Sequence, residues 1–296
     1  MTGAAAPIAH PGGRGPWHDA FGRLRKNRLA MAGFAFLVLV TLLCFAWPAI
    51  AGLDPVTTHP EHRYLAPSVL HPFGTDGLGR DYLARVLFGG RTSLLVGFAA
   101  AASSVAIGVV YGAISGYYGG RTDEVMMRFV DFMYGLPYMF LVILIMMLFS
   151  EKARGNPIPV FLALGLVEWL TMARVVRGQV LGLAGREFVL AARLFGTSDL
   201  RIIARHVLPN VAGVVTVYGT LTVPSVIILE SFLSFLGLGV KLSWGQLVSE
   251  GVSVVNPVRS YWWLLFFPSV LLAATLFCLN FVGDGMRDAV DPKGRR

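Results

Sequence analysis

Charge is scarce in this sequence of 296 residues. Asp, Glu, Lys and Arg together make up 14% of it, about half of the roughly 25% typical of soluble globular chains. Hydrophobic residues make up 55%, and the mean hydropathy is +0.65. These values exclude a soluble domain, a disordered or collagen-like chain and a coiled coil. They predict a protein whose main solvent is the lipid bilayer.

Cysteine and the common nucleotide-binding motifs are also scarce or missing. The two cysteines, Cys44 and Cys278, lie in apolar runs, which excludes a disulfide framework and a zinc site. No lysine follows a glycine, so there is no Walker A loop, and no Gly-x-Gly carries the third glycine of the dinucleotide fingerprint. We therefore expect the chain to bind no cofactor. If the chain takes part in active transport, the energy must come from a partner chain or an ion gradient.

Three residues that favour metals, His59, Glu61 and His62, lie close together in the sequence. They stand in a proline-containing stretch without a helical frame that would fix their spacing. We therefore expect no metal site there.

Long charge-free windows are the main feature that the sequence does contain. Each has about the length needed to cross a bilayer as a helix, roughly 20 residues. Five windows cover 29–53, 92–120, 132–150, 207–229 and 260–283, and a weaker sixth, 157–173, is interrupted by Glu168. The sequence therefore predicts an all-α protein with six transmembrane helices.

The basic residues indicate the orientation of these spans. With the amino terminus inside, 17 of the 25 Lys and Arg residues fall on the inner side, as the positive-inside rule requires. Both termini are then cytoplasmic, and we expect no binding to nucleic acid. The predicted regions are a tail at 1–28, a first span at 29–53, an external loop at 54–91, a core of five spans at 92–286 and a tail at 287–296.

Small residues and prolines distinguish the spans from one another. Gly108, Gly112 and Gly116 form two successive small-xxx-small steps on one face of the second span, which lets another backbone approach closely in lipid. We favour packing within the chain over a subunit interface. Pro137, Pro224 and Pro268 fall inside or at the edges of the third, fifth and sixth spans, where kinks are tolerated.

Two acidic residues lie deepest in apolar sequence, Glu168 and Glu230. A charge at the bilayer centre costs about 2.5–3.5 kcal/mol on insertion scales, so such side chains face an interior or water. Each is a candidate either for a pathway carboxylate or for a hydrogen-bonded structural one.

The inner segment from Arg186 to Asn210 is the most informative. Apolar residues at i, i+3, i+4 and i+7 predict a short helix with one common face, made of Phe188, Ala191, Ala192 and Phe195. Gly196 stands at a C′ position, Thr197 or Ser198 can cap a second short helix with Asp199 in its first turn, and Pro209 is expected to stop it. Between two spans, this pattern favours a docking element for a cytoplasmic partner.

The same segment resembles the permease subunits of binding-protein-dependent ABC importers. Their signature reads Glu-Ala-Ala, three residues, Gly, nine residues, Ile, one residue, Leu-Pro. Ala191, Ala192, Gly196, Leu208 and Pro209 match it, whereas Leu190 replaces the glutamate and His206 the isoleucine. The resemblance implies that residues 187–209, here called the coupling segment, contact an ATPase, with Glu187 a candidate for the role of the missing glutamate.

Further blocks narrow the resemblance to peptide importers. They are 71–81, 90–97, 172–179, 230–239 and 281–292, and the last three are most similar to the second, C-type permease of oligopeptide importers. The resemblance implies a type I importer permease in a bacterial inner membrane. Its partners would be a sister permease, two cytoplasmic ATPases that hold ATP and Mg²⁺, and an external peptide-binding protein; this chain itself would not be an enzyme.

Other functions stay open at this point. Within the ABC class, the cargo could be a dipeptide, nickel or another small solute. Outside it, the alternatives are an ion-coupled secondary transporter and a channel or structural membrane subunit.

Overall fold

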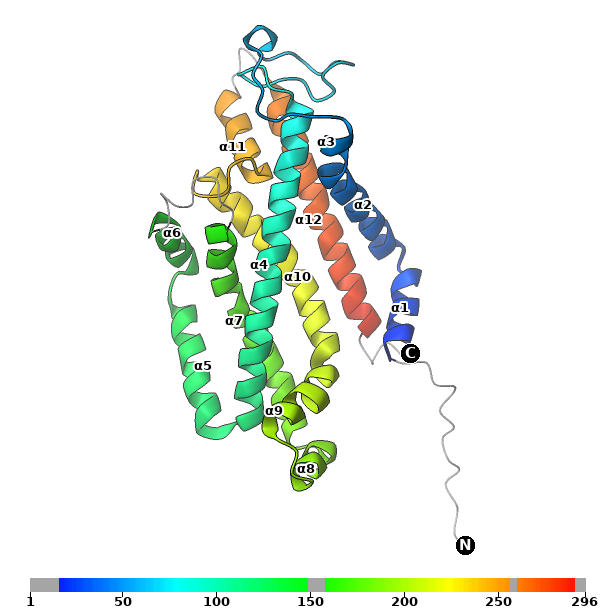
Figure 1. Cartoon of the computed structure of the whole chain (residues 1–296), viewed down its shortest axis with the longest axis vertical. Helices are drawn as coiled ribbons and strands as arrows, with labels where there is room; N and C mark the ends of the chain where they lie inside the picture. Colours follow the sequence, from blue (N-terminus) through cyan, green and yellow to red (C-terminus); the bar gives the residue numbers. More distant parts are fainter. Residues whose placement is uncertain (1–15, 149–157, 256–259, 291–296) are drawn as a thin grey trace.

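A computed structural model describes residues 16–148, 158–255 and 260–290. Within these ranges the regular elements are all helical, apart from one isolated bridge between Thr75 and Asp81. The predicted all-α membrane fold is confirmed (Figure 1). Parts of the predicted tails at 1–28 and 287–296, and the junction between the predicted third and fourth spans, lie outside the described residues.

The elements follow one another in a simple order. They are α1 (Pro16–Lys26), α2 (Arg28–Phe45), α3 (Trp47–Ile50), η1 (Pro60–His62), α4 (Tyr82–Tyr118), α5 (Gly120–Gly135), α6 (Tyr138–Leu148), α7 (Ile158–Ala184), α8 (Glu187–Leu194), α9 (Asp199–Ile202), η2 (Ile203–Val207), α10 (Leu208–Phe235), α11 (Trp244–Val254) and α12 (Trp262–Val290).

The helices that are suited to a membrane agree with the predicted spans. Four helical stretches are long and apolar enough to cross a bilayer, Arg28–Ile50, Tyr82–Tyr118, Asp199–Phe235 and Trp262–Val290, and the pair α5 and α6, bent by 83°, is a fifth candidate. The weaker predicted span at 157–173 falls in α7, a helix of 27 residues. The helix count is therefore consistent with six spans.

Two of the predicted spans have different limits in the structure. The helix α4 begins at Tyr82, well before the charge-free window at 92–120, because the Asp81 carboxylate caps it by accepting a hydrogen bond from the Ala84 amide. The predicted third span is not one helix, because α5 starts at Gly120 and the chain breaks at Leu136 before Pro137. Proline disfavours a helical residue before it.

Among the described helices, α4 and α7 pack against each other most extensively. The contact runs along the face of α4 that carries the three spaced glycines. A Cβ atom added to Gly108, Gly112 or Gly116 would lie 2.4–2.8 Å from atoms of α7, including the carbonyl oxygens of Ala173 and Arg177. Only glycine permits this approach. The expected packing within the chain is confirmed.

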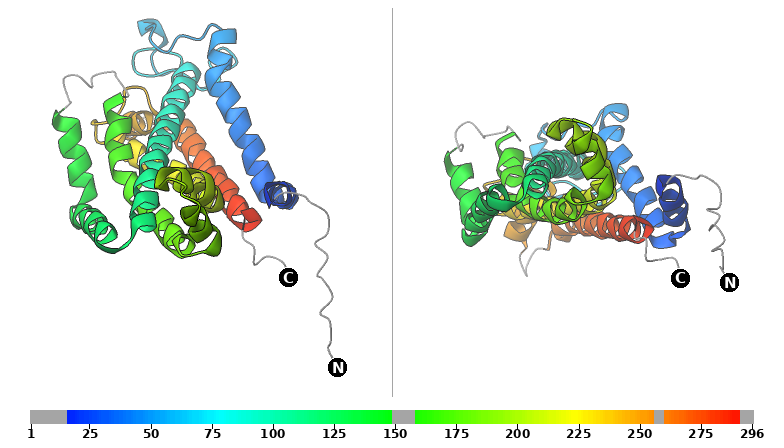
Figure 2. Two further views of the ribbon diagram at one scale, coloured as in Figure 1. Left: turned by 60° about the horizontal axis from the view of Figure 1, so that its bottom comes forward. Right: turned by 90° about the horizontal axis from the view of Figure 1, so that it is seen from below.

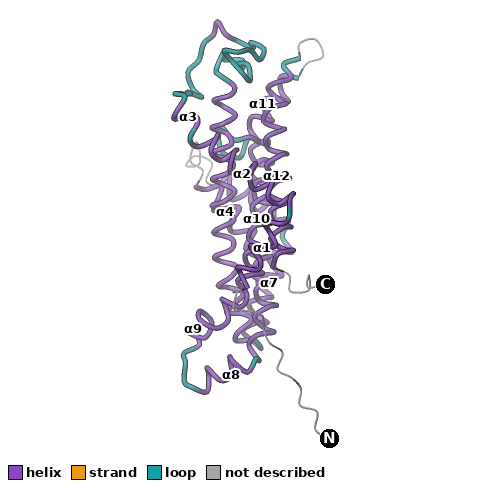
Figure 3. Tube along the Cα trace, turned by 90° about the vertical axis from the view of Figure 1, so that its right-hand side faces the viewer, coloured by secondary structure: helices purple, strands orange, loops and turns teal. Residues whose placement is uncertain are grey.

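The two ends of the molecule carry different structures (Figures 1 and 3). At one end, the 54–81 loop lies over the start of α12, where the Trp263 indole N–H donates to the Thr75 carbonyl over 3.2 Å and the Tyr64 and Tyr261 rings stack at 4.0 Å. At the other end lie α8 and α9. The start of α1 and the end of α12 are on this second side of the bundle, as the predicted topology requires.

Seen from below, the helices spread along one direction, with α5 at one edge and α1 at the other (Figure 2). The sequence analysis did not anticipate α11, which lies in the expected loop between the last two spans. Its Trp244 side chain is fully buried, and the indole N–H donates to the Val86 carbonyl of α4 at 3.0 Å. α11 thus belongs to the core.

Candidate functional site

The end of α8 has the turn that the sequence predicts. Gly196 has φ +75°, the left-handed conformation that glycine adopts without strain. Its amide donates to the Arg193 carbonyl, and the Thr197 amide donates to the Ala192 carbonyl. This arrangement satisfies carbonyls at the end of the helix. Gly196 therefore stands at the C′ position as expected.

The faces of α8 correct one detail of the sequence analysis. Val189 is fully buried, and Ala192, three residues on, packs half-buried against the same apolar cluster as Ile202 and Val207. Phe188 and Phe195 point outward with 40% and 89% of their side chains exposed, and Ala191 is exposed with them. Ala192 is therefore on the inward face of α8 and not on the expected common face.

The exposed tip of the coupling segment is apolar. Leu194 and Leu200, which the sequence pattern did not single out, are 89% and 75% exposed and extend the apolar surface that includes Phe195 within the same short segment. Leu190, which stands where the motif has glutamate, and Glu187, the candidate substitute for that glutamate, are both exposed. An open groove of about 640 Å³ runs past Glu187 and Phe188. Clustered exposed apolar side chains on a segment between spans are suited to a partner surface.

The coupling segment is firmly joined to the spans above it. The Tyr117 hydroxyl at the end of α4 donates to Oδ1 of Asp199 in α9 over 2.7 Å, and the Arg193 guanidinium lies 5.1 Å from the Tyr117 ring centre. Ile202 and Val207 are fully buried against residues of α4 and α7, such as Tyr117 and Val180. The tip and the inner ends of these spans therefore form one packed unit.

Pro209 does not stop the second helix, contrary to the sequence prediction. The chain passes from α9 through the π-helical turn η2 into α10, where Pro209 occupies the first turn. Proline lacks an N–H and fits a first turn. The Asn210 side-chain amide donates to the His206 carbonyl at 2.6 Å, which satisfies one acceptor near the wider turn. The motif residues Leu208 and Pro209 thus continue the coupling segment into a span.

Glu230 is the buried end of a hydrogen-bond network. Its carboxylate has no exposed surface and accepts from the Ser234 hydroxyl at 2.6 Å and the Ser93 hydroxyl at 3.1 Å. The Ser93 oxygen in turn accepts from the Trp244 amide at 3.2 Å. The network connects α10, α4 and the start of α11. These contacts favour the structural interpretation of this residue.

Glu168 lies elsewhere, in a pocket of about 250 Å³ between α7 and the α5–α6 break. The structure therefore does not bring the two acidic residues together. Glu168 is half-buried. Among the side chains that the structure describes, none donates a hydrogen bond to it or pairs with it.

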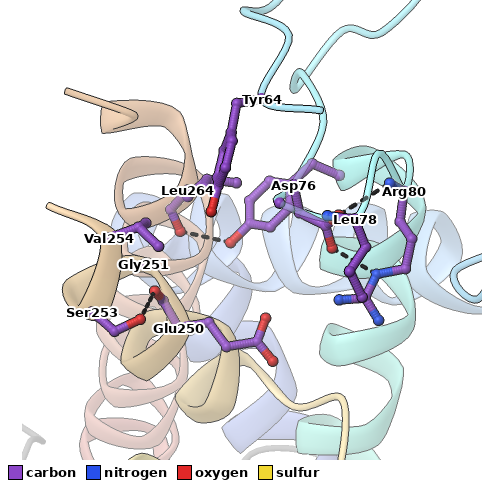
Figure 4. Close-up of a pocket in the computed structure, with 11 residues that line it drawn as sticks. Tyr64, Asp76, Leu78, Arg80, Glu250, Gly251, Ser253, Val254 and Leu264 are labelled. Carbon is purple, nitrogen blue, oxygen red and sulfur yellow. Dashed lines mark hydrogen bonds and ion pairs between the residues drawn. The ribbon is translucent and has the colours of Figure 1, made fainter. Parts of the chain in front are cut away.

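An ion-pair cluster at the opposite end was missed by the sequence analysis. Arg85 is 4% exposed, and one of its terminal nitrogens lies 2.8 Å from Oδ2 of Asp76 and 2.7 Å from Oε2 of Glu250. Asp76 also accepts from Arg80 at 2.7 Å. Asp76, Arg80 and Glu250 line a pocket of about 300 Å³ (Figure 4). The residues follow no local motif, since Glu250 is 165 positions from Arg85.

The nearby histidines form no metal centre. His59 and His62, and His62 and His71, have ring centres 5.7 Å apart, and His71 pairs with Asp81 at 2.9 Å. In the ranges 16–148, 158–255 and 260–290, no group of three or more His, Cys, Asp or Glu side chains is arranged to hold a metal ion.

Comparison with known proteins gives consistent results. The family model described as "Binding-protein-dependent transport system inner membrane component" matches residues 108–296, and "N-terminal TM domain of oligopeptide transport permease C" matches residues 15–67. The chain is 48% identical over 288 residues to the oligopeptide transport system permease protein OppC of Escherichia coli (strain K12), covering 96% of this chain and 93% of that one.

Two further relatives extend the comparison. The chain is 47% identical to OppC of Haemophilus influenzae, over 96% of this chain and 90% of that one. It is 44% identical to the dipeptide transport system permease protein DppC of Bacillus subtilis (strain 168), over 94% and 86%. An inward-facing structure of the MetNI methionine ABC transporter shares the fold, with a TM-score of 0.58 at 16% identity over 71% of this chain and 98% of that chain.

Proposed function

The chain belongs to the family of binding-protein-dependent transport system inner membrane components, and from this premise we propose that it is one of two permeases of an ATP-driven peptide importer. It is a membrane permease subunit of the ABC importer class and not an enzyme. Peptide as the cargo is supported by the relatives named as oligopeptide and dipeptide permeases.

The observation that carries this proposal is the coupling segment. Its exposed tip, with Phe195 and Leu200, is apolar, whereas its inner face is packed on α4 and α7 through Val189 and Ile202. A close-packed interior transmits displacement because it has few voids to absorb it. Movement of a protein bound at the tip would therefore move the inner ends of these spans.

The proposal assigns distinct tasks to the partners. A sister permease completes the pathway, two cytoplasmic ATPases bind ATP and Mg²⁺ and move the coupling segments, and an external binding protein delivers peptide. The contact residues proposed for this chain are Glu187, Phe188, Ala191, Phe195 and Gly196, with Ala192, Leu208 and Pro209 holding the segment in place. The chain itself contributes shape and movement but no bond chemistry.

Reconstitution tests the proposal. The chain is co-purified with the sister permease and ATPase subunits of the same transporter, placed in proteoliposomes and supplied with the binding protein. We expect uptake of a labelled tripeptide that requires ATP, stops with vanadate and persists with a protonophore. Uptake abolished by the protonophore alone would indicate a secondary transporter, and uptake of nickel without peptide would overturn the proposed cargo.

A further inference from the structure

The pocket around Glu168 stands at a break in the membrane-spanning part of the fold. α5 and α6 meet at an angle of 83° and lie at one edge of the bundle (Figure 1). The pocket is lined by residues on both sides of this break and by residues of α7. Glu168 is the eleventh residue of α7, about 15 Å along the helix at 1.5 Å per residue. Glu168 therefore lies well inside α7 and away from both of its ends, and an ionisable side chain within a membrane span requires a partner or water.

The neighbouring charges leave the Glu168 charge uncompensated. Arg174, one and a half turns further along α7, pairs with Asp131 at 2.6 Å and stacks on the Tyr134 ring at 3.9 Å. That arginine is already neutralised. Since no described side chain pairs with Glu168, its ionised form gives the pocket a net negative charge.

The rest of the lining suits a small cationic group. Tyr138, which is 45% exposed, adds an aromatic ring to the lining, and aromatic faces attract ammonium groups. Thr171 offers a hydroxyl, already bonded to the Tyr134 hydroxyl at 2.8 Å. The volume of about 250 Å³ is smaller than the roughly 300–1,000 Å³ of sites for drug-sized ligands, so it admits one end of a peptide and not the whole.

We propose that this pocket binds the amino-terminal ammonium group of the passing peptide, with Glu168 as its counter-ion. The inference rests on the proposed function. The α-ammonium is the cation that unmodified peptides share whatever their side chains, and with a pKa of about 7.7–8.0 it is mostly charged at pH 7. A binding site for it aids passage without selecting a sequence.

The first test measures the charge of the pocket directly. Thr171→Cys is introduced into the assembled complex after Cys44 and Cys278 of this chain are changed to serine. We expect a cationic methanethiosulfonate reagent to modify position 171 about tenfold faster than an anionic one. Glu168→Gln should remove this preference, whereas Glu124→Gln, at an exposed carboxylate of α5 that pairs with Arg128, should keep it. Equal rates for both reagents before the Glu168 change would overturn the proposal.

The second test measures transport of a tripeptide and its N-acetylated form with one binding protein throughout. For each complex, the uptake rate of the tripeptide is divided by that of its N-acetylated form. Dividing this ratio for the Glu168→Gln complex by the ratio for the unmodified complex gives a quotient that isolates the contribution of the permease. We expect that quotient to fall several-fold, with no change for Glu124→Gln. An unchanged quotient would overturn the proposal, and so would loss of the sister permease on purification of the Glu168→Gln chain, because Glu168 would then pair with that neighbour. No peptide uptake by the unmodified complex would instead contradict the proposed function.

Discussion

The Tyr117 hydroxyl and the Asp199 carboxylate, 2.7 Å apart, join the last turn of α4 to the first turn of α9. The bond connects the longest helix of the fold to the coupling segment. Tyr117 is 4% exposed, so the bond is partly shielded from water. A movement at α9 therefore reaches α4 through a polar contact as well as through apolar packing.

Tyr117→Phe removes this bond while keeping the ring. A hydrogen bond to a charged group contributes about 1.5–3 kcal/mol to stability. Because Asp199 is only half-buried, we expect the variant to lose an amount of stability at the lower end of this range. We expect normal insertion but a several-fold lower stimulation of ATP hydrolysis by the loaded binding protein. Tyr118→Phe, at the neighbouring tyrosine that is 51% exposed, serves as the control. Equal stimulation in both variants would contradict the linkage.

Phe195→Ala tests the exposed tip. Aromatic residues at the centre of an interface often contribute 2 kcal/mol or more, about a thirtyfold change in affinity. We expect a loss of that order in binding of the ATPases, measured with the purified permease pair in nanodiscs. Phe21→Ala replaces a phenylalanine of α1 that is 61% exposed and should leave the affinity unchanged.

Bulk on α8 distinguishes its two faces. Ala191→Trp adds volume to the exposed face and should block the ATPases while the chain remains stable. Ala192→Trp adds the same volume to the inward face, next to Val189 and Ile202, and overpacking there costs about 1–3 kcal/mol. We expect only the second variant to lower the melting temperature of the purified permease pair. Equal melting temperatures would place Ala192 on the exposed face after all.

Glu230 should respond to charge more than to shape. Glu230→Gln keeps the size and can still accept from Ser93 or Ser234, so we expect mild effects on stability and uptake. Glu230→Lys places a cation without an acidic partner where the carboxylate had no exposed surface, and we expect loss of folded protein by size-exclusion chromatography. Normal peptide uptake by the lysine variant would show that the side chain faces water.

The buried ion pair at the other end predicts a strong effect of Arg85. Arg85→Met removes the shared partner of Asp76 and Glu250. Because Asp76 keeps Arg80 and the Glu250 side chain is 39% exposed, we expect a loss of stability at or below the lower end of the about 3–5 kcal/mol for breaking a buried pair. The melting temperature of the purified permease pair should fall clearly. Arg91→Met, on the same helix at an exposed position, should change it little. A similar fall in melting temperature in both variants would contradict a special contribution of the ion-pair cluster to stability.

Orientation is tested by labelling in intact cells with an impermeant maleimide, after Cys44 and Cys278 are changed to serine. Thr58→Cys lies in the exposed loop at one end of the molecule, and Ser198→Cys lies exposed at the other. We expect labelling of position 58 alone until the cells are opened. The reverse pattern would invert the topology.

The sequence predicted those parts of the fold that depend on a few neighbouring residues. The apolar windows, the close α4–α7 contact at Gly112 and the left-handed turn at Gly196 each follow from a few neighbouring residues. Other features depend on partners far away in the sequence. The early start of α4 includes Arg85, whose charge is neutralised by Asp76 and by the distant Glu250, and α11 is a helix within a predicted loop whose Trp244 is buried against α4.

The candidate site was predictable to a similar degree. The spacing of Phe188, Ala191 and Phe195 located the outward face of α8, but helical periodicity alone could not assign Ala192, which packs on the inward face. The continuation through Pro209 depends on the π turn and the Asn210 bond. The α5–α6 break follows from Pro137, a local signal, whereas the pocket at Glu168 is formed by three helices, which no single window contains.

Photo-crosslinking from the tip of α8 tests the central claim most directly. Benzoylphenylalanine replaces Phe195 in the whole transporter in native membranes, with the same replacement at Phe21 as a control, and the covalent products are identified by mass spectrometry. The account predicts an adduct between position 195 and an ATPase subunit, changed in yield by ATP, and none from position 21. Adducts from position 195 with lipid alone, or with the ATPase equally from both positions, would contradict it.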